Sequence, residues 1–117
     1  MIKRLASAAD FDNEVSAGNV VVDFNATWCG PCRMMGQIID NIQEDYENIT
    51  FLSVDVDQYP QLANRFRVTS IPFMVFYANG EQIQVRNSAG QTSSGLLGAR
   101  SETDFCDILD TSFTNQG

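Results

Sequence analysis

Two cysteines separated by two residues, Cys29 and Cys32, are the side chains best suited to chemistry in this 117-residue chain. Thiols at this spacing can close a small disulfide ring or open to two thiols. The preceding run, residues 19–25, is predicted to be a buried strand, and residues 33–46 carry apolar side chains at helical spacing. Cys29 is therefore expected where a strand ends and a helix begins, and free backbone N–H groups and the helix dipole favour an anion there. Because a thiolate is such an anion, the spacing predicts a redox-active Cys29.

A zinc site and a pair of inert thiols are the alternatives for these two cysteines. Zinc is usually held by four ligands. The chain has no histidine, and its third cysteine, Cys106, is far away in sequence. A carboxylate-rich site would be unusual for a thiolate pair. The motif therefore favours redox chemistry, and we expect neither a metal ion nor a bound cofactor.

Asp23 is the second candidate, because it is a carboxyl group within an apolar run. Its neighbours are Val22 and Phe24. An unpaired carboxylate in a buried strand is energetically costly and tends to remain protonated at neutral pH. The alternative is a partly solvated residue at the end of a strand with no role in chemistry.

Further motifs follow these residues in a fixed order. W-C-G-P-C at 28–32 has Asp23 six residues before its first cysteine, F-L-S-V-D-V-D stands at 51–57, and I-P-F-M-V-F-Y-A-N-G-E stands at 71–81. In this order the segments resemble the thioredoxin family. The resemblance covers residues 1 to about 82 and resumes from about Gly98.

The resemblance implies an α/β structure, the thioredoxin fold, with a central mixed β-sheet flanked by helices on both faces. It also implies a protein-disulfide reductase in which Cys29 attacks a substrate disulfide and Cys32 resolves the mixed disulfide. Asp23 would lie behind Cys32 and accept its proton. Pro72 would be a cis-proline facing the cysteine pair, so that the backbone of Ile71 is free to bind substrate. A trans-proline that opens the next strand is the alternative.

The remaining implications concern the contact surface and the partners. Trp28, Gly30 and Pro31 would complete an apolar, nearly flat substrate patch, although a single tryptophan is also often buried in the core. The expected partners are disulfide-containing proteins and a flavoprotein, thioredoxin reductase, that reduces the pair again. The implied roles are electron transport and cell redox homeostasis.

Two other functions remain open at this point. A disulfide oxidase or isomerase of the same fold commonly has a histidine between its cysteines, whereas this chain has Gly30 and Pro31. A non-catalytic binding module is the alternative from another class. Retention of both cysteines and Asp23 argues against it.

The size and charge of the chain restrict its domain organisation and its partners. The chain is long enough for one hydrophobic core, so residues 1–117 are expected to form a single domain. A net charge of −8 with one lysine, Lys3, argues against nucleic acid and anionic membrane surfaces as partners. The opening segment lacks the apolar core of a secretory signal. We therefore expect a cytoplasmic monomer.

Strands and helices are predicted to alternate along the chain. Ser7 and Asp10 resemble a capping box, Gly18 is expected to end the first helix, and Asn79-Gly80 predicts a hairpin whose returning strand carries Ile83 and Val85. Phe105, Ile108 and Leu109 give the last helix a buried side, and Cys106 beside them is interpreted as structural, with pairing between two copies as the alternative. The expected strands are 2–5, 20–24, 51–56 and 73–78, and the expected helices begin after Ser7, at Cys29 (to Glu47), at Pro60 and after Ser101.

Four features differ from the family pattern. Gly36 stands where the family usually has the proline that kinks the helix after the cysteines, and Ser53 replaces a frequent lysine near the buried Asp23. Arg33 stands where lysine is usual, which keeps a positive charge beside the site. The stretch before Gly98 is longer than the family pattern, and its extra part, residues 87–94, is polar and loop-like. We take Gly98 rather than Gly90 as the family's late glycine. The insert should then form a longer hairpin or a loop at the Asn79-Gly80 end.

Overall fold

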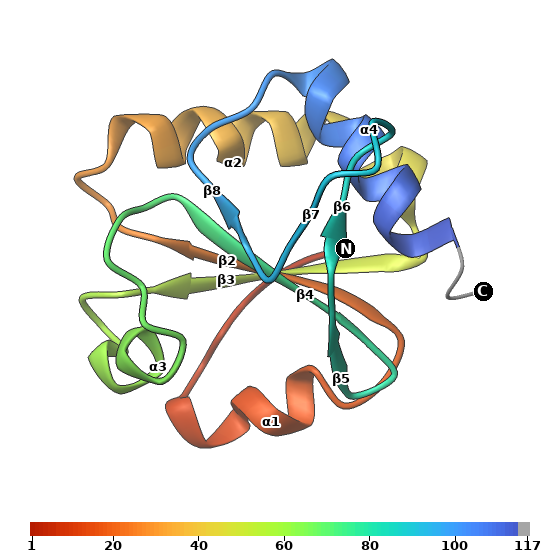
Figure 1. Ribbon diagram of the computed structural model, residues 1–117. Helices are drawn as coiled ribbons and strands as arrows, with labels where there is room; N and C mark the ends of the chain where they lie inside the picture. The colour runs from red at the N-terminus through yellow and green to blue at the C-terminus, as the bar shows by residue number, and fades with distance from the viewer. Residues whose placement is uncertain (115–117) are drawn as a thin grey trace.

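A six-stranded mixed sheet runs through the centre of the computed structural model, which describes residues 1–114 (Figure 1). The strand order is β1-β3-β2-β4-β5, and β8 also pairs with β4. β1, β3 and β2 are parallel, whereas β4 is antiparallel to β2, β5 and β8. The strands are β1 (Ile2–Arg4), β2 (Asn19–Asn25), β3 (Ile49–Asp55), β4 (Phe73–Ala78), β5 (Glu81–Ile83) and β8 (Leu96–Leu97).

Helices cover both faces of this sheet, as the sequence predicts (Figure 1). One face carries α1 and α3, and the other carries α2 and α4. Short 3-10 turns precede α1 and follow α2. The helical segments are η1 (Ala8–Asp10), α1 (Phe11–Glu14), α2 (Gly30–Ile42), η2 (Gln43–Tyr46), α3 (Pro60–Arg65) and α4 (Glu102–Phe113).

Strand β2 is buried on both faces because a helical layer covers each of them. Val20 and Val22 pack into the cluster beneath α1 and α3, whereas Val21 packs into the cluster beneath α2 and α4. Side chains alternate between the two faces of a strand, so Asp23 shares the face of Val21. The carboxyl group is therefore directed toward the layer that contains α2.

The first helical segment begins after Ser7, as predicted, but its capping bond and its end differ from the prediction. The side chain of Ser7 makes no capping hydrogen bond; its backbone carbonyl accepts from the N–H of Asp10 instead, at 3.1 Å. The helical segment begins as a 3-10 turn, and this backbone hydrogen bond takes the place of a side-chain cap. The helix ends at Glu14 rather than Gly18, because Val15 turns into the core. Gly18, with φ of +71°, leads the chain into β2.

The other predicted ends agree better with the structure. Asn79 and Gly80 both have positive φ and form the hairpin turn between β4 and β5. The hydroxyl of Ser101 accepts from the N–H of Asp104 at 3.2 Å and caps α4. Phe105, Ile108 and Leu109 are buried. The long helix expected from Cys29 to Glu47 is divided into α2 and η2.

The insert forms a hairpin, but not where the sequence predicts it. β6 (Val85–Arg86) and β7 (Thr92–Ser93) make a separate two-stranded ribbon that interrupts the edge of the sheet between β5 and β8. Ile83 and Val85 consequently lie on different strands. The ribbon lies beside α4 in Figure 1, where the hydroxyl of Ser112 bonds to both the N–H and the C=O of Arg86. These bonds and the burial of Val85 hold the ribbon beside α4 rather than at the Asn79-Gly80 turn.

We predict that Gly95→Ala destabilises the fold, because a Cβ at Gly95 would lie 2.3 Å from the ring of Phe73 and 3.2 Å from the carbonyl oxygen of Met74. Overpacking of this kind costs about 1–3 kcal/mol. Gly36→Ala is the matched control, since its Cβ meets no atom within 4 Å. Removing a glycine from a helix interior should stabilise by up to about 1 kcal/mol. In urea denaturation, the free energy of unfolding should fall for Gly95→Ala and rise for Gly36→Ala. Equal denaturation midpoints for the two variants would contradict this account.

We also predict that the ribbon is dispensable for the disulfide reduction that the sequence suggests. Replacing residues 87–94 by Asn-Gly should leave that activity within about twofold, since the segment contacts α4. Loop-closure entropy grows slowly with length, so the free energy of unfolding should change by only about 1 kcal/mol. A collapse of activity in a folded variant would show that the ribbon acts on the cysteines.

Candidate active site

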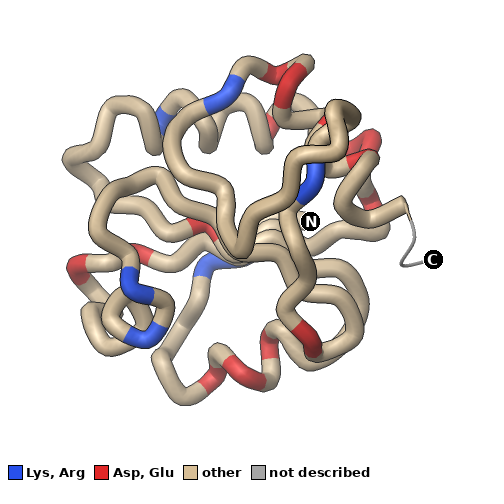
Figure 2. The backbone as a smooth tube through the Cα atoms, in the orientation of Figure 1, with Lys and Arg blue, Asp and Glu red and all other residues tan. Residues whose placement is uncertain are grey.

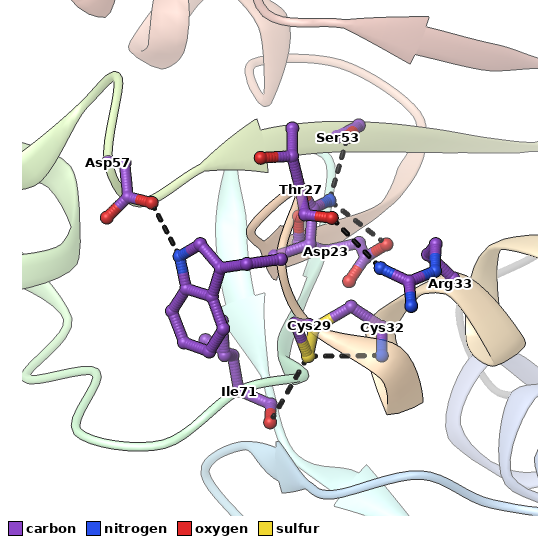
Figure 3. Close-up of a disulfide and its surroundings, with 10 residues drawn as sticks. Asp23, Thr27, Cys29, Cys32, Arg33, Ser53, Asp57 and Ile71 are labelled. Carbon is purple, nitrogen blue, oxygen red and sulfur yellow. Dashed lines mark hydrogen bonds between the residues drawn. A yellow bond between two sulfur atoms is a disulfide. The ribbon is translucent and has the colours of Figure 1, made fainter.

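The two cysteines form a disulfide at the N-terminus of α2 (Figure 3). Cys29 is the N-cap residue, and its Sγ accepts from the backbone N–H of Cys32 at 3.2 Å. Pro31 suits the first turn because its missing N–H would have no partner there. An ordinary capping residue offers oxygen in this place. Here sulfur receives the donor, so a thiolate on Cys29 would be stabilised by the same geometry.

Exposure does not distinguish the two sulfurs in this oxidised form. Cys29 lies at the start of α2 and Cys32 one turn inside, yet both cysteines are only 5% exposed. Their surroundings differ instead. Cys29 Sγ lies 3.9 Å from the carbonyl oxygen of Ile71, whereas Cys32 borders a pocket on the opposite side together with Asp23. The distinction between an attacking and a resolving thiol therefore depends on neighbours rather than on accessible area.

The Ile71-Pro72 peptide bond is cis, as the resemblance implies. This places the carbonyl of Ile71 beside Cys29 (Figure 3). Gly98 donates its N–H to the carbonyl of Pro72 at 2.8 Å and has φ of +86°. The late glycine beside the proline is thus Gly98, and not Gly90 in the ribbon.

Trp28 lies on the surface and not in the core. Its side chain is 67% exposed, and its indole N–H donates to the carboxylate of Asp57 at 2.8 Å. Met34 in the first turns of α2 and Leu97 on β8 are also exposed apolar side chains. Leu97 pairs with Phe73, the residue after the cis-proline. Apolar groups therefore lie on several elements around the disulfide.

Asp23 lies beneath α2 and is 6% exposed. Burial raises the pKa of its carboxyl group to about 6, and a hydrogen bond from the side chain of Asn25 opposes that rise. Oδ1 is buried without a hydrogen-bond partner, and it is the one buried side-chain oxygen or nitrogen of this kind within residues 1–114. The pKa is raised, as the sequence predicts, but a value of about 6 leaves the carboxyl mostly ionised at neutral pH, so the expectation that it stays protonated there is wrong.

A pocket of about 370 Å³ connects this carboxyl to the second cysteine. Asp23 and Cys32 both line it, with Gly36 and Ile39 on the helix side and Phe51 on the sheet side. Groups that line one cavity can exchange a proton directly or through water. Asp23 and Cys32 therefore share one pocket, which agrees with the expected position of the carboxyl.

Residue chemistry alone did not single out two of the polar residues near the disulfide. Asn25 contacts both Asp23 and Ser53, and Asp57 holds Trp28. Asn25 ends β2 and Asp57 follows β3, and both residue types are common at the ends of strands, so nothing in the sequence distinguishes them. Arg33, expected to keep a positive charge beside the site, donates to the carbonyl of Thr27 at 3.0 Å.

Cys106 lies far from this pair along the chain and is half-buried on α4. It packs against the cluster beneath α2 and α4, which fits its interpretation as a structural side chain. Among residues 1–114, no three His, Cys, Asp or Glu side chains come together in a way that could hold a metal ion. Every helix in the described part of the chain is too short or too polar to cross a bilayer.

Comparison of the chain with known proteins identifies its family. The family model described as thioredoxin matches residues 3–101. Thioredoxin-2 of Saccharomyces cerevisiae is 39% identical over 85 residues, which cover 71% of this chain and 82% of that protein. A thioredoxin of Staphylococcus aureus is 41% identical over 76 residues, covering 64% of this chain and 73% of that protein. The chain belongs to the thioredoxin family.

Solved structures agree with this assignment. The oxidised thioredoxin of Plasmodium falciparum superposes with a TM-score of 0.75 at 28% identity, covering 95% of this chain and 97% of that one. Oxidised mitochondrial thioredoxin 3 of Saccharomyces cerevisiae gives a TM-score of 0.72 at 30% identity, covering 93% and 94%. The protein is therefore a thiol-disulfide oxidoreductase that reduces protein disulfides. Its redox group is its own cysteine pair, as in the rest of the family.

We predict that the two cysteines trap substrates unequally. Cys32→Ser should accumulate mixed disulfides with target proteins, because Cys29 attacks and no thiol is left to resolve the product. Cys29→Ser should accumulate few. Non-reducing electrophoresis followed by mass spectrometry measures both, and equal trapping would contradict the assignment of Cys29 as the attacking thiol.

We predict that Asp23→Asn stabilises the fold at neutral pH. The folded carboxyl has a pKa of about 6, compared with its ordinary value of 3.8. Between these values the folded state binds more protons than the unfolded state, so native stability falls as pH rises from about 4 to 6. The loss amounts to about 3 kcal/mol above pH 6. Urea denaturation should show the variant more stable at pH 7 and nearly equal to wild type at pH 3; equal stability at pH 7 would contradict the raised pKa.

Proposed function

We propose that this chain is a general cytoplasmic protein-disulfide reductase that a flavoprotein, thioredoxin reductase, reduces again after each turnover. The observation that carries the proposal is the disulfide at the N-terminus of α2, with the cis-Ile71-Pro72 bond on one side and the Asp23 pocket on the other. The two sides of the disulfide suit two different steps. The side of Ile71 and Pro72 is suited to binding a peptide, and the side of the Asp23 pocket is suited to accepting a proton.

In the first step the Cys29 thiolate attacks one sulfur of a substrate disulfide. A Cys29–substrate disulfide forms, and the other substrate sulfur leaves as a thiolate that takes a proton from water. Next, the Cys32 thiol gives its proton to the Asp23 carboxylate and attacks Cys29. The Cys29–Cys32 bond forms, the Cys29–substrate bond breaks, and the second substrate sulfur leaves as a thiolate that takes a proton from water. The substrate gains two electrons, and the protein's dithiol becomes a disulfide.

Substrate binding is assigned to the surface around the disulfide. The backbone of Ile71, directed at Cys29, can pair with an extended peptide as a short strand. Trp28, Gly30 and Pro31 form the expected apolar floor, and the exposed side chains of Met34 and Leu97 extend it. Backbone pairing and apolar contact do not depend on substrate sequence, which suits a general reductase.

The direction of transfer follows from the residues between the cysteines. Gly30 and Pro31 supply no cationic side chain to stabilise the Cys29 thiolate further. A less stabilised dithiol holds its electrons less tightly and is the better reductant. An oxidase would need the opposite arrangement, so the oxidase or isomerase alternative receives less support.

Charge supports the proposed partners. Asp and Glu residues gather along α1 and α4 (Figure 2), and the net charge is −8. An acidic surface disfavours nucleic acids and anionic lipids. The protein is therefore proposed to act as a monomer on other proteins.

Insulin reduction tests this proposal. With NADPH and thioredoxin reductase, the protein should reduce insulin, and the separated chains should precipitate. The Cys29→Ser/Cys32→Ser double variant should be inactive. The midpoint potential should lie near about −270 mV, the value already known for thioredoxins, rather than near the −120 mV or so of a strong oxidase. An oxidising potential, or turnover with dithiothreitol but not with the reductase, would contradict the proposal.

A further inference from the structure

Asn25, the last residue of β2, makes contacts for which the two thiol exchange steps have no use. Its side-chain Nδ2 lies 2.8 Å from Ser53 Oγ, 3.1 Å from the backbone oxygen of Asp23 and 3.4 Å from Asp23 Oδ2. We propose that Asn25, anchored by Ser53, is a positioning residue that holds Oδ2 of the Asp23 carboxylate and leaves Oδ1 to accept the Cys32 proton. This inference rests on the proposed role of Asp23.

The orientation of the Asn25 amide follows from its neighbours. The backbone oxygen of Asp23 is always an acceptor, and Oδ2 is purely an acceptor when the carboxyl is ionised. Ser53 Oγ can also accept a hydrogen bond. Turning the amide over would place its oxygen against both Asp23 acceptors. The NH₂ group therefore faces them. Its nitrogen then donates to Ser53 Oγ and to the two oxygens of Asp23.

Strand register places these three side chains together. Ser53 on β3 pairs directly with Asp23 on β2, and Asn25 follows Asp23 by two residues on the same face of the strand. The short side chain of Ser53 leaves room for the amide of Asn25 to reach its hydroxyl. The contact is consequently built into the sheet and does not depend on a mobile loop.

The two carboxylate oxygens have different surroundings as a result. Oδ2 meets the Asn25 donor, whereas Oδ1 has no partner within the described residues, and Asp23 lines the pocket shared with Cys32. Oδ1 can accept a proton from Cys32 without displacing an existing hydrogen bond, whereas protonation of Oδ2 would compete with the Asn25 donor. The same pocket offers water a route for the proton to leave.

Few charges compete with Asn25 at this carboxyl. Arg33 and Asp40 of α2 are the other charged residues that line the pocket, and the guanidinium of Arg33 donates to Thr27. The residues paired with Asp23 on β3 and β4 are Ser53 and Met74, which are uncharged. β1 contributes Ile2 to the pocket wall, and its Arg4, the register partner of Ser53, lines the neighbouring pocket with Asn25 and Ser53 but is not among the residues that lower the pKa of Asp23. The neutral donor of Asn25 is thus the side chain that favours the ionised form of Asp23, in agreement with the direction of its effect on the pKa.

Asn25→Ala tests this assignment, with Asn19→Ala as its matched control. Asn19 begins the same strand, and its side chain makes no hydrogen bond within the described chain. Removing the Asn25 donor should raise the midpoint of Asp23 titration, followed by carboxyl ¹³C NMR, by about 0.5–1 pH unit. Resolution of a mixed disulfide, followed by stopped-flow, should then slow about two- to fivefold near pH 6 and less at pH 8. Asn19→Ala should change neither quantity.

A second variant keeps the test valid if Asn25→Ala does not fold. Ser53→Ala removes only the anchor, and should shift the midpoint in the same direction by a smaller amount. An unchanged Asp23 midpoint in a folded variant, together with slow resolution by Asp23→Asn, would overturn the positioning role alone. If Asp23→Asn resolves mixed disulfides at the wild-type rate, the base role of Asp23 fails, and the positioning role fails with it.

Discussion

The packing of α2 against one face of β2 is the contact on which the site depends. Met35 and Ile39 of the helix lie in one cluster with Val21 of the strand, and all three are buried. This packing places the start of the helix at the end of the strand. It also covers Asp23 two residues after Val21, so one contact fixes the disulfide and raises the pKa of the carboxyl beneath it.

A consequence is that the two sulfurs face different surroundings although they are equally buried. Cys29 lies beside the carbonyl of Ile71, which the cis peptide bond directs toward it. Cys32 lies against the pocket that holds Asp23. Contact with a peptide and transfer of a proton are thereby separated across a single disulfide. The ribbon of β6 and β7, bound to α4 through Ser112, leaves both sides free.

Much of this arrangement was predictable from sequence because it depends on local patterns. The apolar run of residues 19–25 followed by helical periodicity predicts the strand and helix that flank Cys29. Asn79-Gly80 predicts a hairpin turn, because both residues accept positive φ. Ser101 predicts the start of α4 through its capping hydroxyl. The family resemblance added the cis bond at Pro72, which residue patterns alone leave undecided.

Other features depend on which strands become neighbours, and local patterns carry no such information. The early end of α1 follows from the way Val15 enters the core. The ribbon is held by bonds to α4 that join residues 26 positions apart. By itself, the sequence determined the redox pair, the buried carboxyl and the order of strands and helices. Only the tertiary structure decided that Asn25 and Ser53 meet at Asp23, because the register of β2 against β3 brings them together.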